Sequence, residues 1–300
     1  MAERRIVAVV GATGSGKSDV AMAAATAAGA EIVAVDAFTV YRGMDIGTAK
    51  PPARDRLDVA HHMVDVLETS EPCSVQWFQQ AARAAIADVL DRGRTPLLVG
   101  GSGLYFRTVV DPLEFPPTDA GVRAAIEERF AGDAAPAHRA LQAVDPQAAA
   151  HMDPGNLRRA VRALEVYELT GRPFSDWRRA WEHWDSVFPS LRVVGLACDR
   201  ETLTRRLDAR VETMIGAGWL QECRRLSSTD MSTAARQAIG YAELFDHLEG
   251  DLPLGEAVER IKVRTRRFAA RQDRWFRKDP RVEWAAADQA PDLVRSLCTL

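Results

Sequence analysis

Cysteine is scarce in this sequence, and long apolar runs are absent from it. The four cysteines lie far apart with no Cys-x-x-Cys pair, which argues against a zinc ribbon and against a secreted disulfide framework. The longest nearly uncharged stretch, Val20 to Val35, is interrupted by Glu31 and is shorter than the ~20 apolar residues of a membrane span. The apolar run within residues 1–10 is too short for the apolar region of a signal peptide. We therefore expect a cytoplasmic protein without a membrane segment.

An excess of charge of one sign is also absent. The 39 Lys and Arg residues against 42 Asp and Glu residues give a formal charge of -3, so composition alone indicates no nucleic-acid partner, although a local basic patch remains open. The six histidines form no metal-binding constellation, because the only adjacent pair, His61-His62, points its side chains apart. With 47% hydrophobic and 27% charged residues in 300, the chain has enough apolar content for one large domain or two smaller ones.

Short, largely apolar runs alternate with helical stretches along much of the chain. The runs are Ile6–Val10, Ile32–Val35, Pro96–Val99 and Leu191–Ala197, and the clearest helical stretches are Ser18–Ala28 and Val75–Asp91. This alternation predicts an α/β fold, with a parallel sheet flanked by helices on both faces.

The pattern changes between about Glu114 and Pro189, where no buried-strand run occurs and Pro and Gly residues separate helical segments. We interpret this part as a helical insertion. The expected organisation is a first part of the core at 1–114, the insertion at 115–189, and a second part of the core at 190–300 that contains a basic C-terminal helix.

A phosphate-binding loop is the strongest local signal. Directly after a predicted strand and before a predicted helix, the pattern G-x-x-x-x-G-K-[ST] is matched by Gly11-Ala12-Thr13-Gly14-Ser15-Gly16-Lys17-Ser18. Glycines let backbone N–H groups turn toward phosphate oxygens, Lys17 adds a point charge, and the Ser18 hydroxyl is placed to ligate Mg²⁺. The loop predicts a P-loop NTPase-like core with a di- or triphosphate site, and it leaves open whether ATP, GTP or another diphosphate ester binds there.

Asp36 directly follows the predicted strand Ile32–Val35. Its carboxylate is expected at the carboxyl edge of the sheet beside the phosphate-binding loop, where ligands bind in open α/β folds. There it can serve as a base or as a metal ligand. A helix cap or a turn is the alternative for an aspartate at a strand end.

The run from Asp36 to Pro51 resembles a signature of the tRNA dimethylallyltransferase family, also called isopentenyl-diphosphate:tRNA transferases. The resemblance extends over most of the chain through Gly100-Gly-Ser-Gly-Leu-Tyr105, Asn156-Leu-Arg-Arg159-Ala-Val-Arg162-Ala-Leu-Glu165, Arg236-Gln-Ala-Ile-Gly-Tyr241 and Arg264-Thr-Arg-Arg-Phe-Ala-Ala-Arg271-Gln272. The zinc-finger extension of eukaryotic relatives is missing, so the chain resembles the bacterial type.

Membership of this family implies transfer of a dimethylallyl group from its diphosphate to the exocyclic amine of the adenosine 3′ of the anticodon, in tRNAs that read U-starting codons. The phosphate-binding loop and Mg²⁺ would then hold the diphosphate leaving group, and Asp36 would take a proton from the amine. Arg236 is the leading candidate for an arginine on the diphosphate, and Arg206 with Arg210 is a second. Ser102 stands where the family usually has Thr and would hydrogen-bond the adenosine.

The resemblance also implies contacts with tRNA. In the core they would come from Ser102 and from the turn Asp36, Ala37, Phe38 and Thr39, in which Ala37 replaces a common Ser and Thr39 replaces the Gln of many members. In the insertion, which would bind the anticodon stem, they would come from Arg123, Arg158, Arg159 and Arg162.

The helical stretch Gly255–Lys278 is strongly basic, with nine Lys and Arg against three Asp and Glu, so that 9 − 3 gives +6. Such a stretch is a credible track for RNA phosphates. We interpret Trp275 and Phe276 within it as core residues because they lie at helical spacing with Phe268, and stacking on bases is the alternative.

Three other functions are alternatives to the one that the family resemblance implies. A P-loop kinase or NTPase would leave the basic helix unexplained, and an adenylate isopentenyltransferase, which acts on a free nucleotide, would leave the arginine-rich insertion unexplained. A non-catalytic RNA-binding module would have no use for Lys17, Ser18 and Asp36. We therefore expect a monomeric tRNA dimethylallyltransferase, with the tRNA anticodon stem-loop and dimethylallyl diphosphate as partners and Mg²⁺ as cofactor.

Overall fold

The computed structural model describes residues 5–299, and the side chains of these except 178–180. The chain folds as two units. Unit 1 contains Met1–Asp111 and Ser186–Leu300, and unit 2 contains Pro112–Asp185. The sequence-based expectation for the insertion is 115–189.

A parallel sheet forms the centre of unit 1. In the described part of the chain it has six strands, in the order β3-β2-β4-β1-β5-β6. Their bounds are β1 Ile6–Val10, β2 Glu31–Ala34, β3 His61–His62, β4 Pro96–Gly100, β5 Leu191–Ala197 and β6 Val282–Ala286. Because all neighbours are parallel, the carboxyl ends of the adjacent strands β2, β4 and β1 meet at one edge of the sheet.

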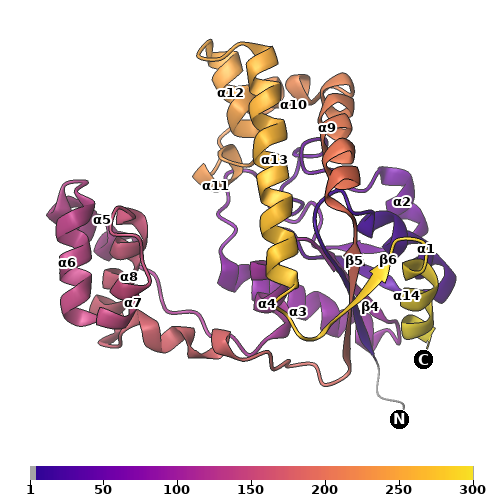
Figure 1. Cartoon of the computed structure of the whole chain (residues 1–300), viewed down its shortest axis with the longest axis horizontal. Helices are drawn as coiled ribbons and strands as arrows, with labels where there is room; N and C mark the ends of the chain where they lie inside the picture. Colours follow the sequence, from indigo (N-terminus) through magenta and orange to yellow (C-terminus); the bar gives the residue numbers. More distant parts are fainter. Residues whose placement is uncertain (1–4, 300) are drawn as a thin grey trace. The chain divides into compact units, whose positions relative to one another are not determined.

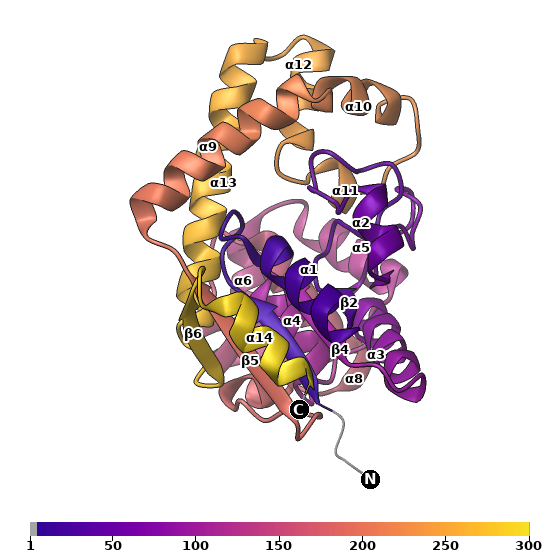
Figure 2. The same ribbon diagram turned by 90° about the vertical axis from the view of Figure 1, so that its right-hand side faces the viewer.

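Helices cover both faces of this sheet, as Figures 1 and 2 show. Helices α1 (Lys17–Ala28) and α14 (Ala290–Thr299) pack against each other on one face, and α3 (Val75–Asp91) and α4 (Gly103–Val110) lie on the other. The expected parallel sheet with helices on both faces is therefore confirmed.

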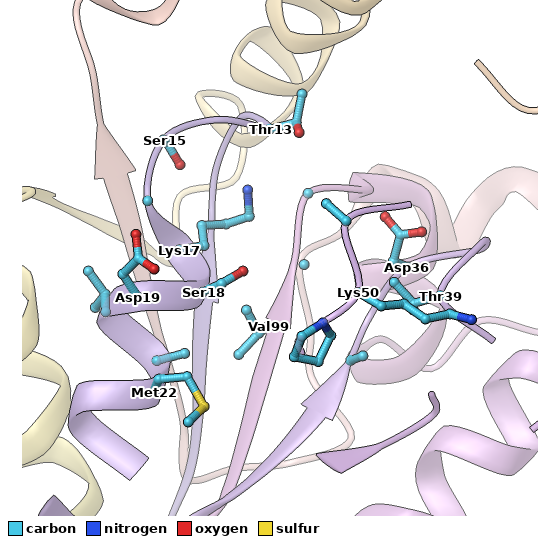
Figure 3. A pocket seen from close by; sticks show the side chains of 18 of the residues that line it. Thr13, Ser15, Lys17, Ser18, Asp19, Met22, Asp36, Thr39, Lys50 and Val99 are labelled. Carbon is cyan, nitrogen blue, oxygen red and sulfur yellow. The ribbon is translucent and has the colours of Figure 1, made fainter. Parts of the chain in front are cut away.

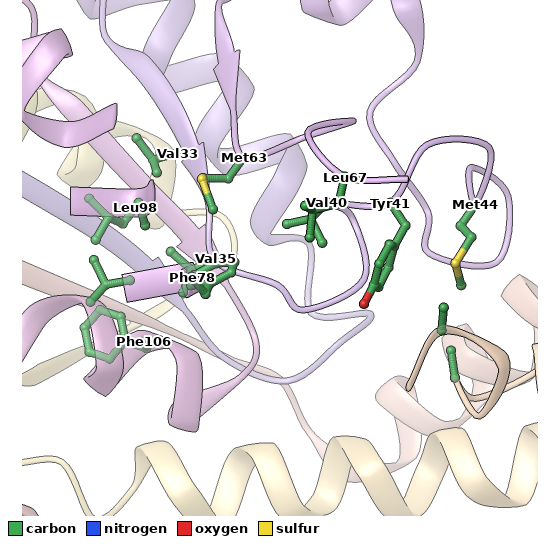
Figure 4. Close-up of a cluster of buried hydrophobic side chains, with 14 of the residues drawn as sticks. Val33, Val35, Val40, Tyr41, Met44, Met63, Leu67, Phe78, Leu98 and Phe106 are labelled. Atoms are coloured by element: carbon green, nitrogen blue, oxygen red, sulfur yellow. The ribbon is translucent and has the colours of Figure 1, made fainter. Parts of the chain in front are cut away.

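Strand β1 shows how the sequence builds two cores. Its five residues are all apolar and all buried, and successive side chains point to opposite faces. Ile6 and Ala8 join the core on the α3 and α4 side, whereas Val7 and Val9 join the core on the α1 and α14 side. Part of the first core is drawn in Figure 4.

The other helices of unit 1 include a group near the C-terminus that contact one another: α9 with α10 and α13, and α12 with α10 and α13. The bounds of these helices are α2 Ala53–Asp58, α9 Arg200–Gly216, α10 Trp219–Leu226, α11 Thr233–Arg236, α12 Tyr241–Glu249 and α13 Leu254–Phe276. No helix among the described residues combines the length and apolar character that crossing a membrane requires.

Unit 2 is helical and has its own small core of residues such as Ile126, Leu141 and Leu164. Its elements are α5 Ala120–Phe130, α6 Ala134–Val144, α7 Pro146–Ala150, α8 Leu157–Thr170 and the 3₁₀ helix η1 Phe174–Glu182. Each of its α-helices has an N-cap residue whose side chain accepts a hydrogen bond from a backbone N–H of the first turn. These residues are Asp119, Asp133, Asp145 and Asn156. Such caps typically stabilise a helix by about 1 kcal/mol each.

The chain leaves unit 1 and returns to it at neighbouring residues. The Val187 N–H donates to the Val110 carbonyl at 2.8 Å, and the Ser186 hydroxyl donates to the same oxygen at 3.1 Å. Both hydrogen bonds join two residues of unit 1, one before and one after the inserted unit 2 in the sequence.

Candidate active site

The phosphate-binding loop joins β1 to α1. Gly16 is the N-cap residue of α1 and has a φ of 95°, a left-handed conformation that favours glycine. The Lys17 ammonium donates a hydrogen bond to the Ala12 carbonyl at 2.7 Å across the loop. A glycine-rich turn at the N-terminus of a helix is an anion-binding arrangement, because backbone N–H groups and the helix dipole both favour negative charge there.

A cavity of about 770 Å³ opens beside this loop, and Figure 3 shows many of its side chains. Residues that follow three neighbouring strands line it: Thr13–Ser18 after β1, Asp36 and Thr39 after β2, and Gly101 after β4. The helices α9 and α13 also contribute, through Arg206, Arg210, Phe268 and Gln272.

Asp36 lies in the cavity two residues after the end of β2. Its Oδ1 atom accepts a hydrogen bond from the Phe38 N–H at 2.8 Å. Burial raises the pKa of Asp36, although the Phe38 and Thr39 N–H groups and the charges of Lys17 and Arg210 oppose that rise. A carboxylate that binds a proton more readily than an exposed aspartate is suited to act as a general base.

Lys17 and Arg210 complete a small group of charges around Asp36. Burial and the charge of Arg210 together lower the pKa of Lys17 to about 7, and the charge of Asp36 opposes this shift. Burial also lowers the pKa of Arg210. Two half-buried cations that line one cavity favour the binding of an anion between them.

Two hydroxyl groups in the cavity are buried without a hydrogen-bond partner among the described residues: Ser15 Oγ and Thr39 Oγ1. A buried polar group left without a partner costs about 1–3 kcal/mol, so both hydroxyls are available to a ligand. Thr39 belongs to the turn expected to meet tRNA. Of the other residues of that turn, Phe38 packs against the main core and Ala37 is half-buried.

Gln272 connects α13 to the phosphate-binding loop. Its Oε1 atom accepts a hydrogen bond from the Thr13 N–H at 2.8 Å, and its amide lies so close to Gly101 that any side chain there would overlap it. Ser102 follows as the half-buried N-cap residue of α4. Ser102 is not among the described residues that line the cavity, whereas Gly101 before it is.

The structure separates the three arginine candidates. Arg206 and Arg210 line the cavity. Arg236, at the end of α11, forms an ion pair with Glu249, and its guanidinium carbon stands 4.7 Å from the centre of the Phe245 ring. Arg236 is not among the described residues that line the cavity, whereas the second candidate pair, Arg206 and Arg210, does line it.

Glu222 of α10 binds the backbone of the loop that follows Asp36, a contact that no sequence pattern predicts. Its side chain, 1% exposed, accepts hydrogen bonds from the backbone N–H groups of Asp45, Ile46 and Gly47 at 2.9–3.3 Å and from the Tyr241 hydroxyl at 2.6 Å. Further along the same loop, Lys50 is fixed by ion pairs with Asp45 and Asp65.

Within unit 2, two of the four arginines expected to contact tRNA form ion pairs with a buried carboxylate. Arg123 and Arg162 both form ion pairs at 2.9 Å with Glu165, which is fully buried, and Arg162 also donates to the Pro116 and Pro117 carbonyls. Burial would raise the pKa of Glu165, but hydrogen bonds from Arg162, from the Asp119 N–H, from the Thr118 hydroxyl and from Arg123 lower it to about 2. Arg158 and Arg159 are exposed at the start of α8.

The core interpretation of the two C-terminal aromatic residues is correct for Phe276 and wrong for Trp275. Phe276 is 0% exposed, but Trp275 is 39% exposed. The α-helix places the two side chains 100° apart, so only one of them faces the core.

Among the described residues no group of three or more His, Cys, Asp and Glu side chains is arranged to hold a metal ion. Two exposed residues at the start of α1 that line the cavity, Ser18 and Asp19, carry oxygen donors. Mg²⁺ prefers oxygen ligands, keeps several waters and is commonly bound through one or two protein groups plus substrate phosphates, which these donors fit.

Comparison with known proteins shows the family. The family model described as IPP transferase matches residues 39–279, and the one described as isopentenyl transferase matches residues 4–61. The tRNA dimethylallyltransferase of Nocardioides sp. is 49% identical over 96% of this chain and 93% of its own length, and that of Geobacillus thermodenitrificans is 43% identical over 93% and 90%.

Solved structures agree with this. The tRNA isopentenylpyrophosphate transferase of Bacillus halodurans is 35% identical, with a TM-score of 0.70 over 98% of this chain and 95% of its own. A eukaryotic dimethylallyltransferase acting on tRNA is 27% identical, with a TM-score of 0.80 over 97% and 75%. The expected P-loop NTPase-like α/β fold is confirmed, and the chain belongs to the IPP transferase family, together with the tRNA dimethylallyltransferases.

Proposed function

We propose that this protein transfers the dimethylallyl group of dimethylallyl diphosphate to the exocyclic amine of the adenosine 3′ of the anticodon, in tRNAs that read U-starting codons. The observation that carries the proposal is a single cavity in which Lys17 and the phosphate-binding loop lie beside the half-buried carboxylate of Asp36. An anion cradle next to a proton acceptor is what alkyl transfer with diphosphate release requires.

In this reaction the amine nitrogen forms a bond to the first carbon of the dimethylallyl group while the bond from that carbon to the diphosphate oxygen breaks. An adenine amine is a poor nucleophile, and Asp36 takes the proton that it loses. Negative charge builds on the departing diphosphate, and the loop N–H groups, Lys17 and Arg210 stabilise that charge from fixed positions. Ser102 and Thr39 hold the adenosine.

The anchor for a divalent ion in this proposal is the Ser18 hydroxyl, with Asp19 beside it. Mg²⁺ supplies additional positive charge to the diphosphate when it is bound. Arg236 stays a predicted diphosphate ligand, which requires release of its ion pair with Glu249. Arg158 and Arg159 supply phosphate contacts from unit 2, where they are exposed.

A transfer assay tests the proposal. It uses labelled dimethylallyl diphosphate, Mg²⁺ and an unmodified anticodon stem-loop with consecutive adenosines, beside AMP as an alternative acceptor and an ATP-hydrolysis control. We expect label on the stem-loop alone. Label on AMP would favour an adenylate isopentenyltransferase, and ATP turnover without prenyl transfer would favour a kinase or NTPase.

A further inference from the structure

We propose that Trp275 of α13 stacks against a nucleobase that flanks the target adenosine, and that it thereby positions the acceptor strand beside Ser102. The inference rests on the proposed function, because it takes the occupant of this surface to be the anticodon loop.

The turn after β4 places Trp275 next to Ser102. The residue before Ser102, Gly101, lies against the Gln272 amide, and the residue after it, Gly103, lies against the five-membered ring of the Trp275 indole. Side chains at either glycine would overlap these α13 residues. Ser102 is therefore bracketed by two contacts with one helix, and the base neighbouring an adenosine at Ser102 comes within reach of the indole.

The indole is fixed on one side and open on another. Contact with Gly103 limits its movement on one side, yet Trp275 is 39% exposed, whereas Trp219 is 2% exposed and Trp77 and Trp284 are half-buried. Leu104, the next residue of α4, is also 37% exposed. A rigid aromatic ring with an accessible surface binds a base at little conformational cost, because the ring is already ordered.

The charge around Trp275 fits RNA. Arg267, Arg271 and Trp275 lie at successive intervals of four on α13 and are all exposed, so they form one row on the helix surface. The Arg271 guanidinium carbon stands 5.7 Å from the centre of the Phe268 ring, and Phe268 lines the cavity. The row thus connects the cavity to the indole through basic side chains that suit a phosphate backbone.

A double-mutant cycle between protein and RNA tests the inference. Transfer is measured with wild type and Trp275→Ala, on the intact stem-loop and on stem-loops that carry an abasic site at one position flanking the target. On the intact stem-loop, Trp275→Ala is expected to raise the KM for the stem-loop about tenfold and to leave the KM for dimethylallyl diphosphate unchanged. When the abasic site is at the stacked position, wild type should show the same rise in the KM for the stem-loop, about tenfold. Trp275→Ala should then raise this KM no further.

Three variants accompany the cycle. Trp275→Tyr keeps an aromatic ring and should retain most of the affinity, and Gly103→Ala should displace the indole and reproduce the loss seen in Trp275→Ala. Trp284→Phe, in the half-buried edge strand β6, is the control and should leave the KM for the stem-loop unchanged.

An equal penalty of Trp275→Ala on every abasic stem-loop overturns the inference, because the indole then contacts no flanking base. A parallel rise of the KM for dimethylallyl diphosphate overturns it as well, since Trp275 would then act through the diphosphate site. Failure of wild type to label any stem-loop would instead overturn the proposed function, so the two failures are distinguishable.

Discussion

The Thr13 N–H in the phosphate-binding loop donates a hydrogen bond to Gln272 Oε1 at 2.8 Å, although the two residues are 259 positions apart. The bond joins the first loop of the chain to α13. The same side chain also packs on Gly101. One glutamine thus sets the spacing between the loops that follow β1 and β4.

Gln272→Ala should therefore weaken binding of dimethylallyl diphosphate. A net hydrogen bond contributes about 0.5–1.5 kcal/mol, so we expect the KM for dimethylallyl diphosphate to rise up to about tenfold, as measured by steady-state transfer kinetics. Gln221→Ala, on the exposed face of α10, is the control. An unchanged KM in Gln272→Ala would show that the loop holds its shape without this bond.

Asp36→Asn should abolish most of the transfer and leave stem-loop affinity nearly intact. General-base catalysis contributes about 10²–10⁴ in rate. Because burial raises the pKa of Asp36 and only the deprotonated form accepts a proton, kcat/KM should fall with decreasing pH through a pKa above the ordinary value for aspartate. A pH–rate profile checks this, and equal losses of binding and rate in Asp36→Asn would exclude the assignment as base.

Lys17→Met should abolish transfer and yet raise the melting temperature at pH 7. Burial lowers the pKa of Lys17 from 10.5 to about 7, so between these values the unfolded chain binds a proton that the folded chain does not. The resulting loss of stability is complete below pH 7 and disappears as the pH rises to 10.5.

Calorimetry from pH 6 to pH 10 measures the gain of Lys17→Met, which should shrink toward alkaline pH. Lys262→Met is the matched control, because ion pairs with Glu212 and Glu259 raise rather than lower the pKa of Lys262. No gain in Lys262→Met is expected. A constant gain in Lys17→Met across the pH range would point to packing rather than charge.

Glu222→Gln should destabilise the protein by about 3 kcal/mol, because charge-assisted hydrogen bonds to buried backbone N–H groups are lost. Tyr241→Phe removes only one of the four donors to Glu222 and should cost about 1 kcal/mol. Urea unfolding measures both. Similar losses in the two variants would mean that Tyr241, not the Asp45–Gly47 loop, is the main partner of Glu222.

Arg158→Ala and Arg162→Ala should differ in kind. The first removes an exposed cation from α8 and should reduce the salt dependence of stem-loop binding by about one unit of slope without loss of stability. The second leaves Glu165 short of a partner and should lower the thermal stability of unit 2. A stable Arg162→Ala variant with a reduced salt dependence of stem-loop binding would show that Arg162 contacts RNA.

The strands that the sequence predicts are the four in the interior of the sheet, whose central residues are mostly buried. Ile6–Val10 and Leu191–Ala197 have the predicted bounds, because a short, largely apolar segment between turns is typical of a buried strand. The edge strands β3 and β6 were not expected: His61–His62 and Val282–Ala286 are largely half-buried, so no apolar run marks them.

The candidate site divides in the same way. The phosphate-binding loop and Asp36 are recognisable because their spacing along the chain is local. Glu222 contacts a loop 177 positions earlier, and the contact of Gln272 is longer still, so tertiary packing alone brings them to the site. The ion pairs of Arg123 and Arg162 with Glu165 were likewise not predicted, because the sequence does not show which carboxylate a basic side chain meets.

The hydrogen bonds between Val110 and the returning residues Ser186 and Val187 also bear on how such a chain arose. Chain segments that lie this close together can be joined by a tight turn, and insertions are best tolerated between such neighbouring ends. An ancestor without residues 112–185 would need only a short connection between α4 and β5 to keep its sheet intact. The helical unit is thus placed so that its length or sequence could change without a change in the sheet of unit 1.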